Sequence, residues 1–158
     1  MKFKYHFLLG VIFAVLLYLL FSTIISLFGL LIIFLSSFLI DVDHYLYYVY
    51  KKGDFSLIRA YSWYMKNARK FCFMSKEKRK QFYLGFYIFH GIEPLIILFF
   101  LGFYISQFFT FILIGFLLHL STDLISEIIF RQKIDKVSVI QNLLLTGKLT
   151  NLEEVDSI

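Results

Sequence analysis

The feature that most constrains this chain is a pair of long stretches that are almost free of charge. Residues 5–40 contain no Asp, Glu, Lys or Arg, and residues 81–122 contain only Glu93. A membrane-spanning helix needs about 20 apolar residues, so each stretch is too long for one ordinary span and long enough for two short ones. The whole chain is 59% hydrophobic with a mean hydropathy of +0.76, far above a soluble domain of this length. The sequence therefore predicts an integral membrane protein.

Small polar residues divide both stretches. Ser22 and Thr23 interrupt the first, and Ser106 and Gln107 interrupt the second. Because lipid offers the backbone no hydrogen-bond partner, each resulting span should be a helix. The expected fold is all-α, an integral membrane four-helix bundle with spans at residues 5–21, 24–43, 82–102 and 108–128.

The start of the chain also resembles a secretory signal, with Lys2 and Lys4 ahead of an apolar core. No small-residue cleavage motif follows, and the apolar run continues into the second expected helix. We therefore expect an uncleaved first span.

The distribution of cations predicts the topology. All 16 Lys and Arg residues fall in residues 2–4, 51–80 and 131–148, outside both expected turns. By the positive-inside rule, both termini and the middle segment should face the cytoplasm. We expect a transmembrane metal-binding helical domain at residues 1–130, which includes a basic and aromatic interfacial segment at 45–80, followed by a cytoplasmic tail at 131–158.

The interfacial segment suggests the partners of the chain. Residues 57–70 have apolar side chains near one face and cations available for anionic headgroups, each cation contributing on the order of 1 kcal/mol near such a surface. This amphipathic helix could lie in the membrane plane or pack on the bundle as a cytoplasmic helix. Membrane lipids are the expected partners. Nucleic acid is not expected, because no base-reading motif accompanies the charge.

Potential metal ligands interrupt the apolar helices at four places. In an up-down-up-down bundle, the start of the first and third helices and the end of the second and fourth lie at the same, cytoplasmic, end. The candidates at these places are His6, then Asp41, Asp43 and His44, then His90 and Glu93, and finally His119 and Asp123. They should therefore converge.

Their spacing indicates a common site. Asp41 with His44 and His90 with Glu93 are three residues apart, and His119 with Asp123 four apart, so each pair would share a helical face, and Glu127 continues the last stripe. Carboxylates facing lipid are costly, so they should face the bundle interior. Helical bundles bind metal ions through inward-facing side chains on neighbouring helices. Imidazole and carboxylate ligands favour zinc, with manganese and iron as alternatives, and the number of ligands allows one or two divalent ions.

Each element also has a plainer interpretation. His6 could be an interfacial histidine, and Asp43 points about 200° away from Asp41 on an ideal helix. The pairs on the third and fourth helices could be buried hydrogen-bonded pairs that tie helices together. Pro94 either kinks the third helix beside Glu93 or lies in its first turn, which would leave His90 in the preceding segment.

The order of these motifs resembles a known family. His6, LIDVDHYLYY, FHGIEPL and GFLLHLSTDLI follow one another across about residues 4–127. This layout is similar to the membrane-bound metal-dependent hydrolases of the LexA-regulated inner-membrane type (YdjM-like), which have an early His and the elements Pro-Asp-x-Asp-His, His-Arg-Gly-x-Thr-His and Gly-x-x-x-His-x-x-x-Asp. The matching residues are Asp41, Asp43 and His44, then His90 and Gly91, then Gly115, His119 and Asp123. Ile40 stands in place of the proline, and Ile92 and Glu93 stand near the missing arginine and second histidine.

The resemblance implies a metal-dependent hydrolase. With the polar constellation, it leads us to expect hydrolysis of a lipid-linked or membrane-adjacent ester or phosphoester at the cytoplasmic face of the cell membrane. The expected metal ligands are His6, Asp41, Asp43, His44, His90, Glu93, His119 and Asp123. Asp43 is expected to bridge or ligate, and Glu93 to ligate or act as general base. The alternatives are a metal-ion or proton carrier, which predicts polar residues continuing toward the outer side, and a non-catalytic structural membrane protein.

Overall fold

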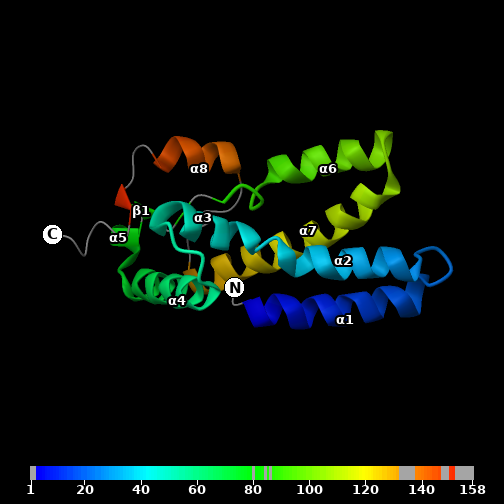
Figure 1. The fold of residues 1–158 in the computed structure, drawn as a ribbon, viewed down its shortest axis with the longest axis horizontal. Helices are drawn as coiled ribbons and strands as arrows, with labels where there is room; N and C mark the ends of the chain where they lie inside the picture. Colours follow the sequence, from blue (N-terminus) through cyan, green and yellow to red (C-terminus); the bar gives the residue numbers. More distant parts are fainter. Residues whose placement is uncertain are drawn as a thin grey trace.

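The computed structural model describes residues 3–79, 81–83, 85, 87–131, 138–146 and 150–151. This part of the chain is helical apart from one pair of two-residue strands (Figure 1), which confirms the all-α class. The elements are α1 (Phe3–Phe21), α2 (Leu27–Leu39), α3 (Val42–Lys52), α4 (Leu57–Phe73), α5 (Lys76–Arg79), β1 (Phe82–Tyr83), α6 (Ile92–Tyr104), α7 (Gln107–Ser126), the π-helical turn η1 (Glu127–Arg131), α8 (Val139–Thr146) and β2 (Thr150–Asn151).

Within the described residues, three helical stretches are long and apolar enough to cross a membrane. They are Lys4–Phe21, Leu27–Lys52 and Gln107–Ile129. The helix α6 is apolar but has only 13 residues, which corresponds to about 20 Å against a hydrocarbon core of about 30 Å. The structure thus supports the membrane character of the chain without establishing the fourth span.

The second expected span, residues 24–43, is wrong at both ends. The turn extends to Ser26, whose Oγ accepts a hydrogen bond from the backbone N–H of Gly29 at 3.1 Å and caps α2. The helix is then interrupted at Ile40 and Asp41, where tighter hydrogen bonds join residues three apart, and it resumes as α3. Gly53, with a φ of 62°, ends α3 in the left-handed conformation that glycine adopts without strain.

The third expected span, residues 82–102, begins ten residues later than predicted, at Ile92. Gly91 is the residue before its first turn, and Pro94 lies within that turn, where the missing N–H costs nothing. Of the two interpretations of Pro94, the first-turn proline is therefore confirmed and the kink is wrong. His90 lies in the segment that precedes the helix.

The main helices alternate in direction around α2. In Figure 1 the α1–α2 turn and the α6–α7 turn both lie toward the right of the view, and α3 and α4 lie toward the left. The helix α2 packs against both α1 and α7, and α7 packs against α6. The four chain positions that carry the candidate ligands consequently lie at one end of the molecule.

Small residues set the spacing between α2 and its neighbours. A Cβ added at Gly115 would overlap Oγ of Ser36 and lie 2.5 Å from the carbonyl oxygen of Ile33. The buried Ser36 hydroxyl donates to the carbonyl of Ile32 at 2.8 Å, so it needs no partner across the interface. A Cβ added at Gly10 would likewise overlap Oγ of Ser37, where α1 contacts α2. Close approach of this kind is how apolar helices associate in membranes.

This packing predicts that Gly115→Ala is destabilising. The added methyl group must push α7 away from α2, and overpacking of this kind costs about 1–3 kcal/mol. The free energy of unfolding in detergent, compared with that of the parent, measures the effect. Ser121→Thr, which adds one carbon at an exposed position of the same helix, is the control. A Gly115→Ala protein as stable as the parent would contradict the close contact.

A polar corner connects α3 to α4. The Asp54 carboxylate accepts hydrogen bonds from Nε of Arg59 at 2.6 Å, from an Arg59 terminal nitrogen at 2.7 Å and from the Ser56 backbone at 3.0 Å, and it also accepts one from the Tyr48 hydroxyl. The bonds from Arg59 hold the pKa of Asp54 well below its usual range, and the same pairing raises the pKa of Arg59. The pair therefore stays ionised throughout the physiological pH range.

The helix α4 packs on the end of the bundle. Its buried residues Ala60 and Phe71 face inward, and Tyr64 stacks on His44 with ring centroids 4.8 Å apart. Packing on the bundle was one of the two interpretations of this segment. On the outside, Ile58 is 81% exposed and Phe73 is 90% exposed. The helix is thus anchored on one face and leaves apolar side chains free on the other.

Candidate metal centre

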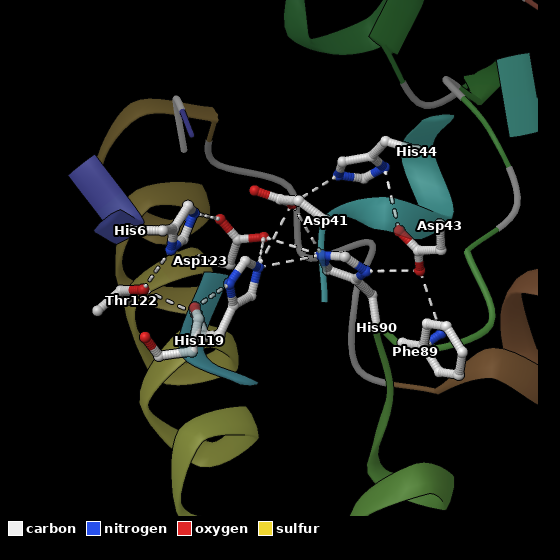
Figure 2. A network of polar contacts seen from close by, with 10 residues as sticks. His6, Asp41, Asp43, His44, Phe89, His90, His119, Thr122 and Asp123 are labelled. Carbon is white, nitrogen blue, oxygen red and sulfur yellow. Dashed lines mark hydrogen bonds and ion pairs between the residues drawn. The ribbon is translucent and has the colours of Figure 1, made fainter. Parts of the chain in front are cut away.

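Six of the eight predicted ligands lie together (Figure 2). They come from the start of α1, the α2–α3 junction, α3, the segment before α6, and the last half of α7. Three overlapping groups offer ligand atoms that lie within 4.8 Å of one another: His6 with Asp41 and His119, Asp41 with His44 and His90, and His90 with His119 and Asp123. Such groups could hold a metal ion.

Burial divides the site into a closed part and an open part. His6, His90, His119 and Asp123 are buried. The side chains of His44 and Asp41 are 13% and 14% exposed. Approach from solvent therefore meets Asp41 and His44 first.

The orientation of His119 is fixed by the backbone of α2. Its Nδ1 lies 2.8 Å from the carbonyl oxygen of Ser37. A carbonyl oxygen can only accept, so we assign the ring proton to Nδ1, and Nε2 of the neutral ring presents a lone pair. The close packing at Gly115 brings α7 near enough for this bond. Nε2 of His119 therefore faces the cluster as a ligand atom.

The orientation of His90 is fixed by Asp43. Nδ1 of His90 lies 2.9 Å from Oδ2 of Asp43, and that same oxygen accepts the backbone N–H of Phe89 at 3.1 Å. A carboxylate on the outer nitrogen of a histidine is the usual partner of a metal-ligating ring, because it sets the tautomer and raises the basicity of the other nitrogen. Nε2 of His90 is thus left to face the cluster.

The Nε2 atoms of His90 and His119 lie close to each other and to two carboxylates. Nε2 of His90 and Nε2 of His119 are 3.2 Å apart. Oδ1 of Asp41 is 3.5 Å from each of these nitrogens, and Oδ2 of Asp123 is 3.7 Å from each. With both outer nitrogens acting as donors, two lone pairs face each other among carboxylate oxygens. A shared proton or a metal cation would satisfy all of them, and a donor set of imidazole and carboxylate suits a divalent ion.

His6 repeats the pattern. Its Nδ1 lies 3.1 Å from Oγ1 of Thr122, and the Thr122 hydroxyl donates its one hydrogen to the carbonyl of His119 at 2.8 Å. Nδ1 of His6 is therefore the donor, and its Nε2 faces Oδ1 of Asp123 at 3.1 Å. The His6 ring also stacks on His119 with centroids 3.9 Å apart.

His44 occupies the open side of the site. Its Nε2 lies 3.2 Å from Oδ1 of Asp41, and its Nδ1 lies 3.6 Å from Oδ1 of Asp43. Tyr64 stacks on the ring, and Tyr87 meets it edge-on with centroids 3.9 Å apart. These aromatic contacts hold the imidazole between the two carboxylates.

Asp43 and Glu93, the two predicted catalytic residues, lie outside the three groups formed by the described residues. Asp43 is buried and orients His90. Oε2 of Glu93 accepts from the Val139 backbone at 2.8 Å, and its Oε1 from Ile140 at 3.2 Å and from the Ser138 hydroxyl. Because α6 begins only at Ile92, His90 and Glu93 do not share a helical face, and that expectation was wrong.

Two orienting groups were missed by sequence reasoning. They are the backbone carbonyl of Ser37 and the hydroxyl of Thr122. Thr122 follows His119 by three residues and so lies on the same helical face, a signal that was available. The pair Ser36 and Ser37 within an apolar helix also marks a close interface. Glu127, which continues the α7 stripe, is buried as well.

The fold and the site define a helical protein which, in the part of the chain that the structure describes, has three helices long and apolar enough to span a membrane and buried His and Asp groups that could hold a metal ion. Comparisons with protein families, with curated proteins and with solved structures find no match to this chain. The resemblance to the LexA-regulated hydrolases therefore remains a prediction from the motifs.

Proposed function

We propose that this chain is an integral membrane hydrolase that uses a divalent metal centre, with zinc as the favoured ion, to cleave a lipid-linked or membrane-adjacent ester or phosphoester. One observation carries the proposal. His6, His90 and His119 each place the outer ring nitrogen on a protein hydrogen-bond acceptor and the inner nitrogen beside shared carboxylates. Each of the three rings thereby turns its Nε2 toward the carboxylates of the cluster, which is the orientation of a histidine that ligates a metal through Nε2.

The ligands would be His6, Asp41, His44, His90, His119 and Asp123. Asp41 belongs to two of the three groups, and so do His90 and His119, so the arrangement suits either one ion or two ions that share ligands. A divalent ion held there would supply Lewis-acid chemistry, which polarises a carbonyl or phosphoryl oxygen and lowers the pKa of water. This chemistry supports the assignment to ester or phosphoester hydrolysis.

The open side of the site would meet the substrate. Asp41 and His44 are the partly exposed members, and the Asp41 carboxylate has a second oxygen that can accept a proton from an attacking water while the first one ligates. The sequence assigned this role to Glu93, whose carboxylate is instead occupied by the start of α8. The buried members would keep the ligand geometry fixed, and the partly exposed members would contact the substrate.

The proposal includes a topology. Four helices, with α6 as a short fourth span accommodated by local thinning of the bilayer, would place both termini, the end of α3, α4 and α5 on the cytoplasmic side. Lys66, Arg69 and Lys70 line one face of α4 together with Tyr61 and Phe73. This face would lie against anionic headgroups. The metal centre would then lie just beneath the inner leaflet surface, where a lipid-linked substrate can reach it.

A turnover assay tests the function. The protein, reconstituted in lipid nanodiscs and loaded separately with zinc, manganese or iron, is given a diacyl phospholipid with a fluorescent headgroup and, separately, a soluble aryl phosphodiester. We expect turnover by the parent and a loss on the order of 10³-fold in Asp41→Ala, since Lewis-acid stabilisation is worth several kcal/mol. Glu77→Ala, which removes an exposed carboxylate of α5, is the control. Metal binding without turnover would favour a carrier, and absence of metal a structural protein; either overturns the proposal.

A further inference from the structure

The segment that delivers His90 is flanked by contacts with the C-terminal part of the chain. Residues 87–91 are neither helix nor strand and lie between β1 and α6. On one side, β1 pairs in parallel with β2, with Phe82 opposite Thr150 and Tyr83 opposite Asn151. On the other side, α8 lies near the start of α6 (Figure 1). We name residues 138–146 and 150–151 the C-terminal strap.

Glu93 forms polar contacts between the strap and the start of α6. Its two carboxylate oxygens accept the backbone N–H groups of Val139 and Ile140 and the hydroxyl of Ser138. The first N–H groups of a helix have no partner within the helix, and the helix dipole favours a negative charge beside them. Glu93 therefore caps α8 from a distance of 45 residues along the chain.

Gly91 brings the backbone next to His90 into direct contact with the strap. A Cβ added at Gly91 would lie 2.6 Å from Cγ2 of Val139 and 2.8 Å from its backbone nitrogen. The same Cβ would lie 2.6 Å from Oε2 of Glu93. No side chain fits between residues 87–91 and α8 at this point. A shift of α8 would therefore displace the main chain at Gly91, one residue from His90.

We infer that the C-terminal strap positions His90 in the metal centre, with Glu93 as the positioning residue that fastens it. The inference rests on the proposed metal centre. His90 belongs to two of the three ligand groups, whereas the group of His6, Asp41 and His119 does not contain it. Release of the strap should therefore weaken the part of the site that depends on His90 and leave the rest in place. Asp43 holds the imidazole ring of His90, and the strap holds the backbone that carries it.

A merely structural cap would behave differently. If Glu93 only stabilised α8, its removal would loosen the C-terminal part of the chain without changing the metal ligands. The two roles are separated by a readout that reports the ligand set, and Co²⁺ provides one because its visible absorption depends on the coordinating atoms. Amide hydrogen exchange of residues 88–92 without metal provides a second.

The test titrates Co²⁺ into the full chain in detergent for Glu93→Ala, Glu93→Gln and the control Glu77→Ala. We expect about tenfold weaker binding and an altered Co²⁺ spectrum for Glu93→Ala, by analogy with the loss when a partner that orients a ligand is removed. Glu93→Gln should lie between it and the parent, because its amide oxygen still accepts. Glu77→Ala should match the parent. Residues 88–92 should exchange faster in Glu93→Ala.

The outcomes separate this inference from the proposed function. A parent chain that binds no Co²⁺ overturns the metal centre itself. Equal affinity and spectrum in the parent and Glu93→Ala overturn the positioning role while the centre stands, even if amide exchange becomes faster. Should Glu93→Ala fail to fold, Ser138→Ala removes one of the three donors and keeps the carboxylate; it should shift Co²⁺ affinity in the same direction by a smaller factor, and an unchanged affinity overturns the inference.

Discussion

Replacing His119 and Asp123 together by alanine is expected to abolish transition-metal binding. The pair supplies ligand atoms to two of the three groups: His119 belongs to both of them, and Asp123 belongs to one. Loss of a group that merely orients a ligand already costs up to about 100-fold in metal affinity, so loss of two ligands should exceed that figure. Elemental analysis of the purified protein, expressed as metal per chain, measures the effect.

The control for this experiment lies on the same helix. Leu117 and Ser121 are exposed positions of α7, so Leu117→Ala with Ser121→Ala carries two alanine substitutions without touching the site. This protein should retain the metal content of the parent. A double variant of His119 and Asp123 that still carries as much metal as the control would show that the ion lies elsewhere.

The convergence of the ligands could be predicted from the sequence, because it depends only on the alternating direction of the helices. Each candidate lies near the end of a helix that is opposite the α1–α2 and α6–α7 turns, or just before that helix begins, and no packing detail is needed to bring such positions to one end. The distances within the site could not be predicted in this way. They depend on how closely α7 and α1 approach α2 at Gly115 and Gly10, and a pattern of apolar residues does not specify that spacing.

The role of Glu93 shows where local reasoning ends. Its spacing from His90 is that of a helical pair, and Pro94 can be interpreted either as a kink or as a first-turn residue. In the structure α6 begins at Ile92, and the Glu93 carboxylate accepts hydrogen bonds from the first N–H groups of α8. That contact is between residues 45 or more apart in the chain, so no sequence window around His90 contains the information.

Tautomers offer a further case. Sequence reasoning identifies histidines, but which nitrogen is available depends on the atom that the other nitrogen contacts. For His119 that atom is a backbone carbonyl of α2, and for His6 it is a threonine hydroxyl of α7. Both partners are brought to the rings only by the packing of the helices. They determine which nitrogen of each candidate histidine can act as a ligand.

Metal loading is also expected to raise the stability of the folded chain strongly. Without a cation, folding brings Nε2 of His90 to 3.2 Å from Nε2 of His119 and places Asp123 beside them, an arrangement that costs free energy in a buried site. A ligand that binds only the folded state stabilises it by about 4.1 kcal/mol at a free concentration of 1,000 times its Kd. For a chain of this size, that figure corresponds to a rise in Tm of roughly 8–16 °C.

Thermal unfolding in detergent, followed by the fluorescence of Trp63, checks this expectation. Trp63 packs against Tyr48, with ring centroids 5.5 Å apart, at the site end of the molecule, so it reports on the packing of α3 with α4. Addition of a strong chelator should return Tm to the value of the metal-free protein, and fresh zinc should restore it. The double variant of His119 and Asp123 should show neither change, because the donors that distinguish the folded from the unfolded chain are gone. A parent protein whose Tm ignores both zinc and chelator would mean that the inward nitrogens are satisfied by a proton, and that the cluster holds the helices together without an ion.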